Sequence, residues 1–377
     1  MPVRPGDTLG SALHRAGVLV LSRSMKYHRP RGLYCCTGSC ASCFVDVDGV
    51  PNVPACTTAA APGMEVRSQN TLGSARRDLL GVVDKVYRRG FDPHGAFTRP
   101  RIVNTMFLKA VRFMSGVGEA PEETMAVEGA GPQRLQLHVH HLVVGGGRKG
   151  LLAAKRHAHR GLATLLVDEA PRLGGSAASD PAERDTLELA AAAEAGAWPA
   201  VEAWTGTLAF GVYGDVVALR RGDDLWEVRA DRITLAPGRH DAWPLFVNND
   251  LPGVLSLRGA RRLLHGHGVL PGRAVVGHGD PLPASFVEAL EAAGGRVVGQ
   301  GEVTEAAGSP VVERARLGEA WVRCDAIVCN LPGTPRVELF QQAGCRLGFE
   351  GGVLAPATGK DGATSVEGMH AAFGGPP

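Results

Sequence analysis

The sequence lacks the features that mark membrane, secreted and nucleic-acid-binding proteins. None of its 377 residues belongs to an apolar run of 18, so we expect no membrane-spanning segment. The first ten residues, MPVRPGDTLG, contain no apolar core of a signal peptide, which predicts a cytoplasmic location. Basic residues exceed acidic ones by only 40 − 38 = 2, a balance that argues against nucleic acid as a partner.

What the sequence does contain is typical of a globular protein. Hydrophobic residues make up 44% and charged residues 21%, so disorder is not expected. At roughly 150 residues per domain, the length predicts two or three domains. Glycine is abundant, with 51 residues, and abundant glycine is typical of backbones that approach a ligand closely.

The cysteines are clustered. Five of the eight lie within a stretch of 22 residues, whereas a disulfide framework would spread them along the chain. Clustered thiols indicate metal or redox chemistry. The three scattered cysteines are predicted to be small buried residues: Cys324, Cys329 and Cys345.

The spacing within this cluster is that of plant-type [2Fe–2S] proteins. Cys35, Cys40 and Cys43 are separated by four and two residues, and Cys56 follows thirteen positions later. Gly38 and Ser39 allow backbone N–H groups to turn toward the sulfur atoms. A zinc site is the alternative, but it usually has two pairs of ligands with a longer spacer. Cys36 could replace Cys35, although it leaves only three residues before Cys40.

The N-terminal region is predicted to be a small β-rich unit. GDTLGSALHRAG indicates a short helix with Asp7 or Thr8 as its N-cap. FVDVDGVPNV alternates around Asp48-Gly49, which predicts a hairpin. Residues 76–125 are basic, with helical patches such as RRDLLGVVDKVYRR, and are interpreted as a connector.

A dinucleotide-binding fold is predicted from His138 onward. HLVVGGGRKGLLAAKRHAHRGLATLLVDE has the order strand, glycine turn, helix, strand and acid. Its glycines fit G-x-G-x-x-G at Gly145, Gly147 and Gly150, and the acids at the end of the second strand are placed to hold a ribose hydroxyl. These acids are Asp168 and Glu169, and the spacing to Gly174 favours Glu169.

A second fold of this kind begins near Ala274, with an altered glycine loop. GRAVVGHGDPLPASFVEALEAAGGRVVG keeps Gly277 and Gly279 but has Leu282 in place of the third small residue. Two prolines also disturb the expected helix start. Binding of a second nucleotide and retention of the fold without its ligand both stay open.

Together these segments resemble the α subunit of heterotetrameric sarcosine oxidase and the related proline, hydroxyproline and cyanide-forming glycine dehydrogenases. The resemblance is carried by KYHRPRG, the cysteine loop, HHLVVGGG, LLVDEAPRLGGS, TGTLAFGVYGDVVAL, LWEVRADRITLAPG and NNDLPGV. It implies an α/β and α+β chain: a β-grasp, ferredoxin-like [2Fe–2S] domain followed by a flavoprotein fold with two Rossmann-like domains. It also implies that Gly174, Gly175 and Gly238 contact the dinucleotide.

The implied domains are a [2Fe–2S] domain over 1–75 and a basic helical connector over 76–137. A dinucleotide-binding domain follows in two segments, 138–240 and 336–377, with a second Rossmann-like domain inserted at 241–335. The family's flavoprotein fold closes with a glycine and an aspartate, and HAAFGGPP at 370–377 has no aspartate. The missing aspartate favours NAD or a loosely held FAD, whereas the resemblance to the dehydrogenases favours FAD. One ADP-containing dinucleotide is expected, with FAD slightly preferred and NAD open.

The resemblance implies an electron-transfer subunit of a flavin-dependent amine or imino-acid dehydrogenase or oxidase. Its partner would be an FAD-containing catalytic subunit of the amino-acid-oxidase type, with further small subunits left open. The alternatives are a stand-alone NAD(P)H-dependent reductase and a non-catalytic scaffold. We predict no catalytic residue in this chain, and we interpret its histidine patches as structural: His138, His140 and His141, and His265 and His267.

Overall fold

The computed structural model describes residues 2–25, 27–86, 99–114 and 132–372. Within the chain it separates two compact units, each built from two segments. Unit 1 contains Met1–Ala126 and Trp243–Leu331, and unit 2 contains Val127–Ala242 and Pro332–Pro377. Lys26 of KYHRPRG, much of the expected connector (87–98 and 115–131) and the final residues from 373 lie outside the described residues.

The N-terminal segment of unit 1 contains short helices and strands. Strand β3 pairs with β4 and β5 in an antiparallel sheet, and β1 pairs with β2. The elements are α1 (Leu9–Arg15), β1 (Ser22–Arg23), β2 (Pro30–Arg31), β3 (Phe44–Val47), β4 (Val50–Pro54), β5 (Val66–Arg67), η1 (Leu79–Gly81), α2 (Val82–Val86) and α3 (Arg101–Met114).

Local sequence explains the first helix and the hairpin. Thr8 is the N-cap of α1 and forms a capping box with Ser11, so of the two expected caps the structure uses Thr8. Asp7 instead pairs with Arg15, whose hydrogen bond holds the pKa of the Asp7 carboxyl well below its usual range. Asp48 and Gly49 both have positive φ between β3 and β4, which confirms the predicted hairpin.

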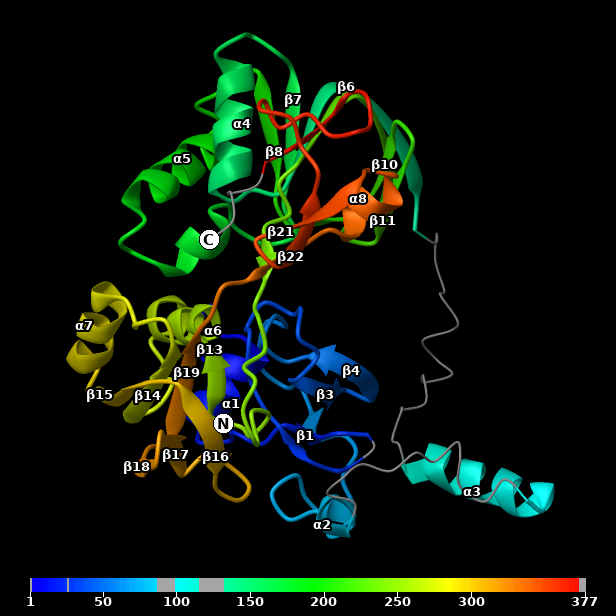
Figure 1. Ribbon diagram of the computed structural model, residues 1–377. Helices are drawn as coiled ribbons and strands as arrows, with labels where there is room; N and C mark the ends of the chain where they lie inside the picture. Colours follow the sequence, from blue (N-terminus) through cyan, green and yellow to red (C-terminus); the bar gives the residue numbers. More distant parts are fainter. Residues whose placement is uncertain (1, 26, 87–98, 115–131, 373–377) are drawn as a thin grey trace. The chain divides into compact units, whose positions relative to one another are not determined.

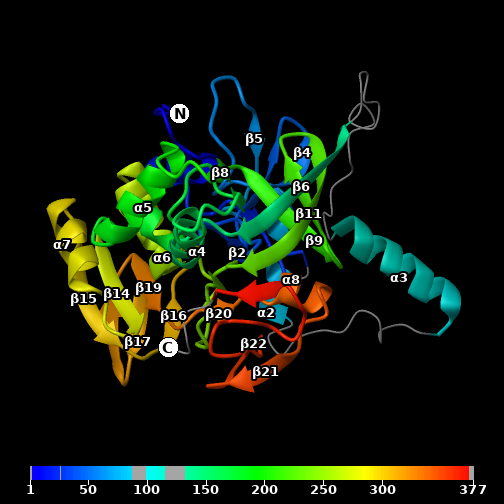
Figure 2. The same cartoon turned by 90° about the horizontal axis from the view of Figure 1, so that it is seen from above.

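The second segment of unit 1 forms a parallel sheet and an antiparallel one. The parallel sheet has the order β13-β19-β14-β15, and β16, β17 and β18 form the antiparallel sheet. Helix α7 lies beside β15 (Figure 2). The elements are β13 (Val254–Ser256), α6 (Leu257–Arg261), the π-helical turn η4 (Arg262–Gly266), β14 (Ala274–Gly279), α7 (Ala284–Ala292), β15 (Arg296–Gly301), β16 (Val303–Ala307), β17 (Arg314–Leu317), β18 (Ala320–Arg323) and β19 (Ala326–Asn330).

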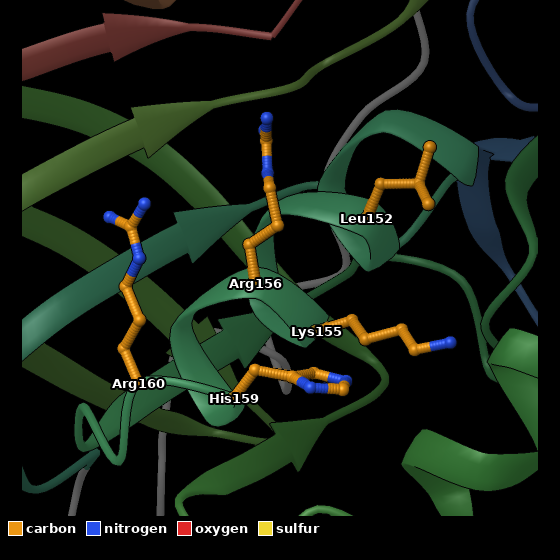
Figure 3. Close-up of a pocket in the computed structure, with 5 residues that line it drawn as sticks. All are labelled: Leu152, Lys155, Arg156, His159 and Arg160. Carbon is orange, nitrogen blue, oxygen red and sulfur yellow. The ribbon is translucent and has the colours of Figure 1, made fainter.

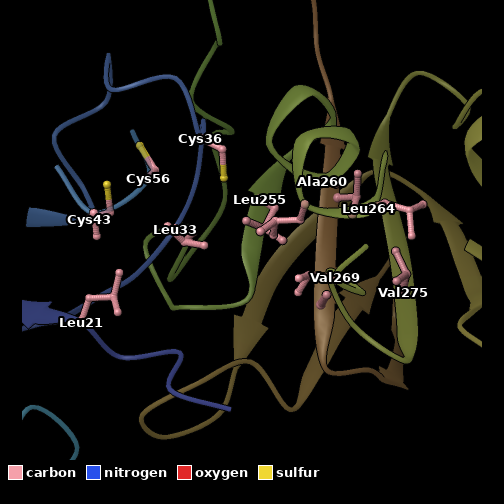
Figure 4. Packing of buried hydrophobic residues seen from close by; sticks show 14 of the residues in the cluster. Leu21, Leu33, Cys36, Cys43, Cys56, Leu255, Ala260, Leu264, Val269 and Val275 are labelled. Atoms are coloured by element: carbon pink, nitrogen blue, oxygen red, sulfur yellow. The ribbon is translucent and has the colours of Figure 1, made fainter. Parts of the chain in front are cut away.

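The two segments of unit 1 share one hydrophobic core (Figure 4). Leu33 and Cys36 from the N-terminal segment belong to the same buried cluster as Leu255, Ala260 and the start of β14. Burial of apolar surface contributes roughly 25 cal/mol per Å², so a shared core ties both segments together. The N-terminal segment is therefore packed directly against the inserted one.

Unit 2 is built on a seven-stranded sheet with the order β8-β7-β6-β11-β10-β9, and β23 also pairs with β11. Strands β8, β7, β6 and β11 are parallel, whereas β10 and β9 are antiparallel. The elements are β6 (Arg134–Val144), α4 (Arg148–Ala158), β7 (Thr164–Val167), η3 (Gly175–Ser179), α5 (Arg184–Glu194), β8 (Val201–Trp204), β9 (Thr207–Tyr213), β10 (Val216–Arg221), β11 (Asp224–Leu235), β12 (Arg239–His240), β20 (Thr334–Pro335), α8 (Glu338–Gln342), β21 (Leu347–Glu350), β22 (Val353–Pro356) and β23 (Met369–Ala371).

Helices α4 and α5 cover one face of the parallel strands of unit 2 (Figure 1). Val143 and Leu166 on the strands pack against Leu151 and Ala154 on α4, and all four are buried. Strands that are buried on both faces read as continuous apolar runs, as LLV does in β7. In the described part of the chain, no helix has the length and apolar character needed to cross a membrane.

Candidate functional site

The four cysteines with iron–sulfur spacing are brought together in unit 1. Cys35, Cys43 and Cys56 are buried, and Cys40 is partly exposed. The Cys35 thiol lies within hydrogen-bonding reach of Cys40 and Cys56, and the Cys43 thiol within reach of Cys56. Figure 4 shows Cys43 and Cys56 beside one another. The hairpin of β3 and β4 places Cys56 beside the other thiols, because Cys56 comes two residues after the end of β4 at Pro54.

The loop between Cys35 and Cys43 is curled, with backbone N–H groups directed at sulfur. The Thr37 N–H donates to the Cys35 thiol and the Gly38 N–H to the Cys56 thiol, each at 3.3 Å. Cys36, Gly38 and Ala41 have positive φ, a conformation that costs a residue with a side chain about 1 kcal/mol. Such a loop presents thiols inward and N–H donors toward them, as the sequence predicts for Gly38.

The ionisation of the four cysteine thiols is consistent with an iron–sulfur cluster, whose iron ions would balance the negative charge of the thiolates. Hydrogen bonds between the thiols lower the pKa of Cys35 and raise that of Cys40 far above its usual range. Four adjacent thiols cannot all ionise unless positive charge lies between them, and iron supplies that charge. Among the described residues, no three His, Cys, Asp or Glu side chains are grouped to hold a metal ion. A two-iron cluster does not require such a group, because each iron takes only two of the four thiolates.

The remaining cysteines are buried outside this loop. Cys324 and Cys329 pack in one apolar cluster of unit 1, and Cys345 packs in the core of unit 2. Burial raises the pKa of the Cys324 thiol to about 12. These side chains therefore lie in the apolar surroundings that the sequence predicts.

The first glycine loop lies between β6 and α4 in unit 2. A Cβ at Gly145 would come within 2.1 Å of the Ala236 carbonyl oxygen, and one at Gly150 within 1.8 Å of the Gly145 oxygen. Both glycines are thus required by the packing of the chain itself. A Cβ at Gly147 would meet only the Gly175 Cα, at 3.8 Å, and the φ of Gly147 is −76°. Neither backbone strain nor packing against neighbouring residues requires glycine at this position. A pyrophosphate that approaches the N-terminus of α4 would require it, because a side chain would take its space.

Of the two acids after β7, Asp168 is hydrogen-bonded to the backbone of the glycine loop and Glu169 is exposed. The Asp168 carboxylate accepts hydrogen bonds from the N–H groups of Gly146 and Ala170. Burial raises the pKa of this carboxyl, and the two backbone N–H groups oppose that effect. Because both Asp168 oxygens are bonded to backbone, Glu169 is the acid that remains exposed for a ribose hydroxyl.

Arg336 joins this site from the distant second segment of unit 2, and the sequence alone did not indicate it. Its Nη1 lies 2.9 Å from Glu169 Oε1, while its Nε is buried without a hydrogen-bond partner among the described residues. A buried donor without a partner costs free energy, which a ligand acceptor would recover. No local sequence signal marks an arginine so far from the glycine loop.

The other expected contacts lie near the same loop. Gly174 donates from its N–H to the Gly146 carbonyl at 2.8 Å, and Gly175 has its Cα against Gly147. Gly238 has a φ of +77°, no atom lies within 4 Å of its Cβ position, and its carbonyl accepts the Arg336 N–H. The residues present therefore fit an ADP-containing dinucleotide.

The second glycine loop, between β14 and α7, is hydrogen-bonded by the side chain of Gln300. A Cβ at Gly277 would come within 2.0 Å of the Gln300 Oε1. Gln300, near the end of β15, accepts the Leu282 N–H through this oxygen and donates from Nε2 to the carbonyls of Gly279 and Asp280. The Gln300 side chain thus ties the second loop to the end of β15.

Two further surface features do not converge on these sites. His138 and His140 are exposed on β6 and share the Asp231 carboxylate, at 3.1 and 2.8 Å. A shallow open depression lies on the outer side of α4 (Figure 3). Its lining is mostly basic: Leu152, Lys155, Arg156, His159 and Arg160.

Arg148, at the start of α4, does not point into the glycine loop. Its Nη1 lies 3.5 Å from the Glu183 carboxylate.

Two protein-family models match the chain where the two sites lie. Residues 1–71 match the 2Fe-2S iron-sulfur cluster binding domain, and residues 143–204 match the NAD(P)-binding Rossmann-like domain. The first match contains all four cysteines with iron–sulfur spacing, and the second contains the first glycine loop. The chain therefore carries a 2Fe–2S domain followed by a dinucleotide-binding Rossmann-like domain.

Two sequence relatives and one solved structure place the chain more narrowly. Sarcosine oxidase subunit alpha of Rhizobium meliloti (strain 1021) is 31% identical over 364 residues, which are 89% of this chain and 36% of that protein. Hydrogen cyanide synthase subunit HcnA of Pseudomonas aeruginosa is 34% identical over 65 residues, covering 17% of this chain and 62% of that protein. The crystal structure of L-proline dehydrogenase from P. horikoshii matches with a TM-score of 0.73 and 22% identity, over 98% of this chain and 65% of that one. At this identity the structural match shows the fold alone.

The fold and the two family matches define a chain that carries a 2Fe–2S domain and a dinucleotide-binding Rossmann-like domain, with the mixed α/β architecture expected from the sequence. More particularly, the chain is a relative of the sarcosine oxidase α subunits over most of its length, which confirms the resemblance. It spans about a third of the length of the sarcosine oxidase α subunit from Rhizobium meliloti.

Proposed function

We propose that this chain is the electron-transfer subunit of a multi-subunit, flavin-dependent amine or imino-acid dehydrogenase or oxidase. The substrate class is that of sarcosine, proline, hydroxyproline or glycine, oxidised on a partner subunit that carries FAD. The observation that carries the proposal is the set of four adjacent thiols at Cys35, Cys40, Cys43 and Cys56 in a chain related to sarcosine oxidase α.

When bound, a [2Fe–2S] cluster supplies one-electron transfer, which a flavin needs in order to pass its two electrons to a one-electron acceptor. The four cysteine thiolates would hold the cluster, and the N–H groups of Thr37 and Gly38 would donate to its sulfur ligands. Those donors stabilise negative charge on sulfur and so favour the reduced form.

The first glycine loop would bind the ADP half of a dinucleotide in the same chain. N–H groups of the first turn of α4 would face the pyrophosphate, and Glu169 would accept from the adenosine ribose. A carboxylate at that position repels a 2′-phosphate, which disfavours NADP. FAD and NAD share this half, so we prefer FAD only slightly.

The first experiment separates the subunit from the stand-alone reductase. The chain is purified alone and assayed for its visible spectrum, its released dinucleotide, NADH oxidation and turnover of the four candidate substrates. We expect cluster absorbance and a released dinucleotide, with neither NADH oxidation nor substrate turnover. NADH oxidation would favour the reductase, and turnover of a substrate by this chain alone would overturn the proposal.

The second experiment tests the cluster ligands and the partner. C40S and C43S should each remove the visible and paramagnetic signals of the cluster, whereas the matched variant C36S should keep them. A tagged chain recovered from its native cells should co-purify with an FAD-containing subunit of the amino-acid-oxidase type. Loss of the cluster in C36S but not in C35S would show that the ligand assignment is wrong. A redox-silent cluster would leave only the scaffold alternative.

A further inference from the structure

The cysteine loop is held by the second Rossmann-like segment of unit 1. The Ser256 N–H, at the end of β13, donates to the Tyr34 carbonyl at 3.1 Å. A Cβ at Gly259 of α6 would come within 2.1 Å of that same oxygen, so the two backbones touch. Tyr34, the residue before the first proposed ligand Cys35, is therefore held by a segment more than two hundred positions later in the chain.

A third contact reaches the residue after that ligand. Arg262, the first residue of η4, donates from Nη1 to the Cys36 carbonyl at 2.9 Å. Cys36 has a φ of +53°, the left-handed conformation that a residue with a side chain rarely adopts. A bond to its carbonyl holds this strained peptide in place, so Arg262 stabilises the loop at the point where it turns.

Arg262 also brings a positive charge to the loop. No carboxylate of the described residues lies within ion-pair distance of its guanidinium, and the side chain is half-buried. Four thiolates and two sulfides give a 2Fe–2S cluster a net negative charge that grows when it accepts an electron. A half-buried guanidinium at the loop stabilises the reduced form more than the oxidised form, because screening by water is incomplete there.

We propose that the second Rossmann-like segment of unit 1 supports the cluster loop. Within it, Arg262 is a positioning residue that holds the loop and raises the reduction potential of the cluster. This inference rests on the cluster assignment made under the proposed function.

The test compares R262Q, which removes the charge, with R262K, which keeps it but loses the planar guanidinium. The cluster midpoint potential is measured by spectroelectrochemistry on the purified full chain, without partner or substrate, and cluster retention is followed as loss of visible absorbance with a chelator. We expect a lower potential in R262Q, a potential near wild type in R262K, and several-fold faster cluster loss in both. Loss of the whole cluster from a folded R262Q, by circular dichroism, also supports the holding role.

The matched control is R296Q, which removes an exposed charge at the start of β15 in the same unit. It should leave the potential and the retention at wild-type values. A wild-type potential and retention in R262Q, or equal shifts in R262Q and R296Q, would overturn the inference. Failure of both Arg262 variants to fold would assign Arg262 to general stability and overturn it as well. A wild-type chain without a cluster would instead refute the underlying cluster assignment.

Discussion

The first glycine loop, between β6 and α4, and the second, between β14 and α7, follow the same local plan. Each comes after a buried parallel strand and precedes a helix and a second parallel strand. They differ at the second glycine of the pattern. Among the described residues a Cβ at Gly147 would meet only the Gly175 Cα, at 3.8 Å, whereas a Cβ at Gly279 would lie 2.6 Å from the Asn330 carbonyl oxygen and 2.7 Å from Leu331 Cδ2. Two loops with the same local plan thus differ in how closely the chain packs against the second glycine.

The largest expected effect is at the first glycine loop. G147V places a branched side chain where the pyrophosphate would lie, and the described residues leave room for its Cβ. A clash of about 3 kcal/mol weakens binding roughly a hundredfold, so denatured variant protein should release almost no dinucleotide. The control G348V makes the same change at an unstrained glycine of β21 with open space around it. Full dinucleotide occupancy in G147V would refute the site.

A smaller effect is expected at the acid that faces outward. E169Q removes the charge that would accept from the ribose hydroxyl and that pairs with Arg336. Losing one charged hydrogen bond costs about 1.5 kcal/mol, which weakens dinucleotide binding roughly tenfold. Calorimetric titration with the dinucleotide that the wild type releases measures this, and E188Q, an exposed acid of α5, is the control. An unchanged Kd would show that Glu169 does not contact the ligand.

A change at the second glycine loop should alter the free energy of unfolding and leave dinucleotide binding unchanged. Q300A removes three weak hydrogen bonds to the second loop, all at 3.3 Å, and should lower the free energy of unfolding by about 1 kcal/mol. Dinucleotide content should stay at the wild-type value, because the bound dinucleotide is assigned to the first loop. Chemical denaturation measures the first quantity and extraction the second. A gain of dinucleotide in Q300A would mean that the second loop retains a binding site.

The smallest effect concerns the pH dependence contributed by Asp168. Burial raises the pKa of this carboxyl above its ordinary value of about 3.9, so the native protein keeps a proton that the unfolded chain has already lost. The free energy of unfolding therefore falls as pH rises from below the unfolded pKa through the native pKa. D168N should lack this step when both proteins are unfolded across the acid range without dinucleotide. An identical pH profile in both proteins would contradict the prediction.

Local patterns in the sequence were sufficient for the elements that build both sites. The Asp48-Gly49 turn, the Thr8 cap and the glycines after β6 act through backbone conformation and neighbouring hydrogen bonds, which a short stretch of sequence encodes. The Thr8 cap and the Asp48-Gly49 turn are therefore found at the positions that the sequence predicts.

The contacts between segments at these sites could not be predicted from local sequence patterns. Arg336 meets Glu169, Gln300 meets Leu282 and Arg262 meets Cys36 only after the chain has folded. None of these side chains stands in a recognisable motif, because each partner lies far along the chain. The sequence accordingly left open whether the second loop binds a nucleotide, and it divided unit 1 into separate domains.

Each unit is assembled from two separate segments, so the chain passes from one unit to the other three times. During synthesis on the ribosome, the four proposed ligand cysteines emerge long before Ser256, Gly259 and Arg262. A nascent chain that stops short of Trp243 has its thiols, but it lacks the Ser256 N–H that bonds Tyr34 and the Arg262 side chain that bonds Cys36. Stable acquisition of iron is therefore expected late in biosynthesis, after the inserted segment has been translated, and an N-terminal fragment should lose its metal readily.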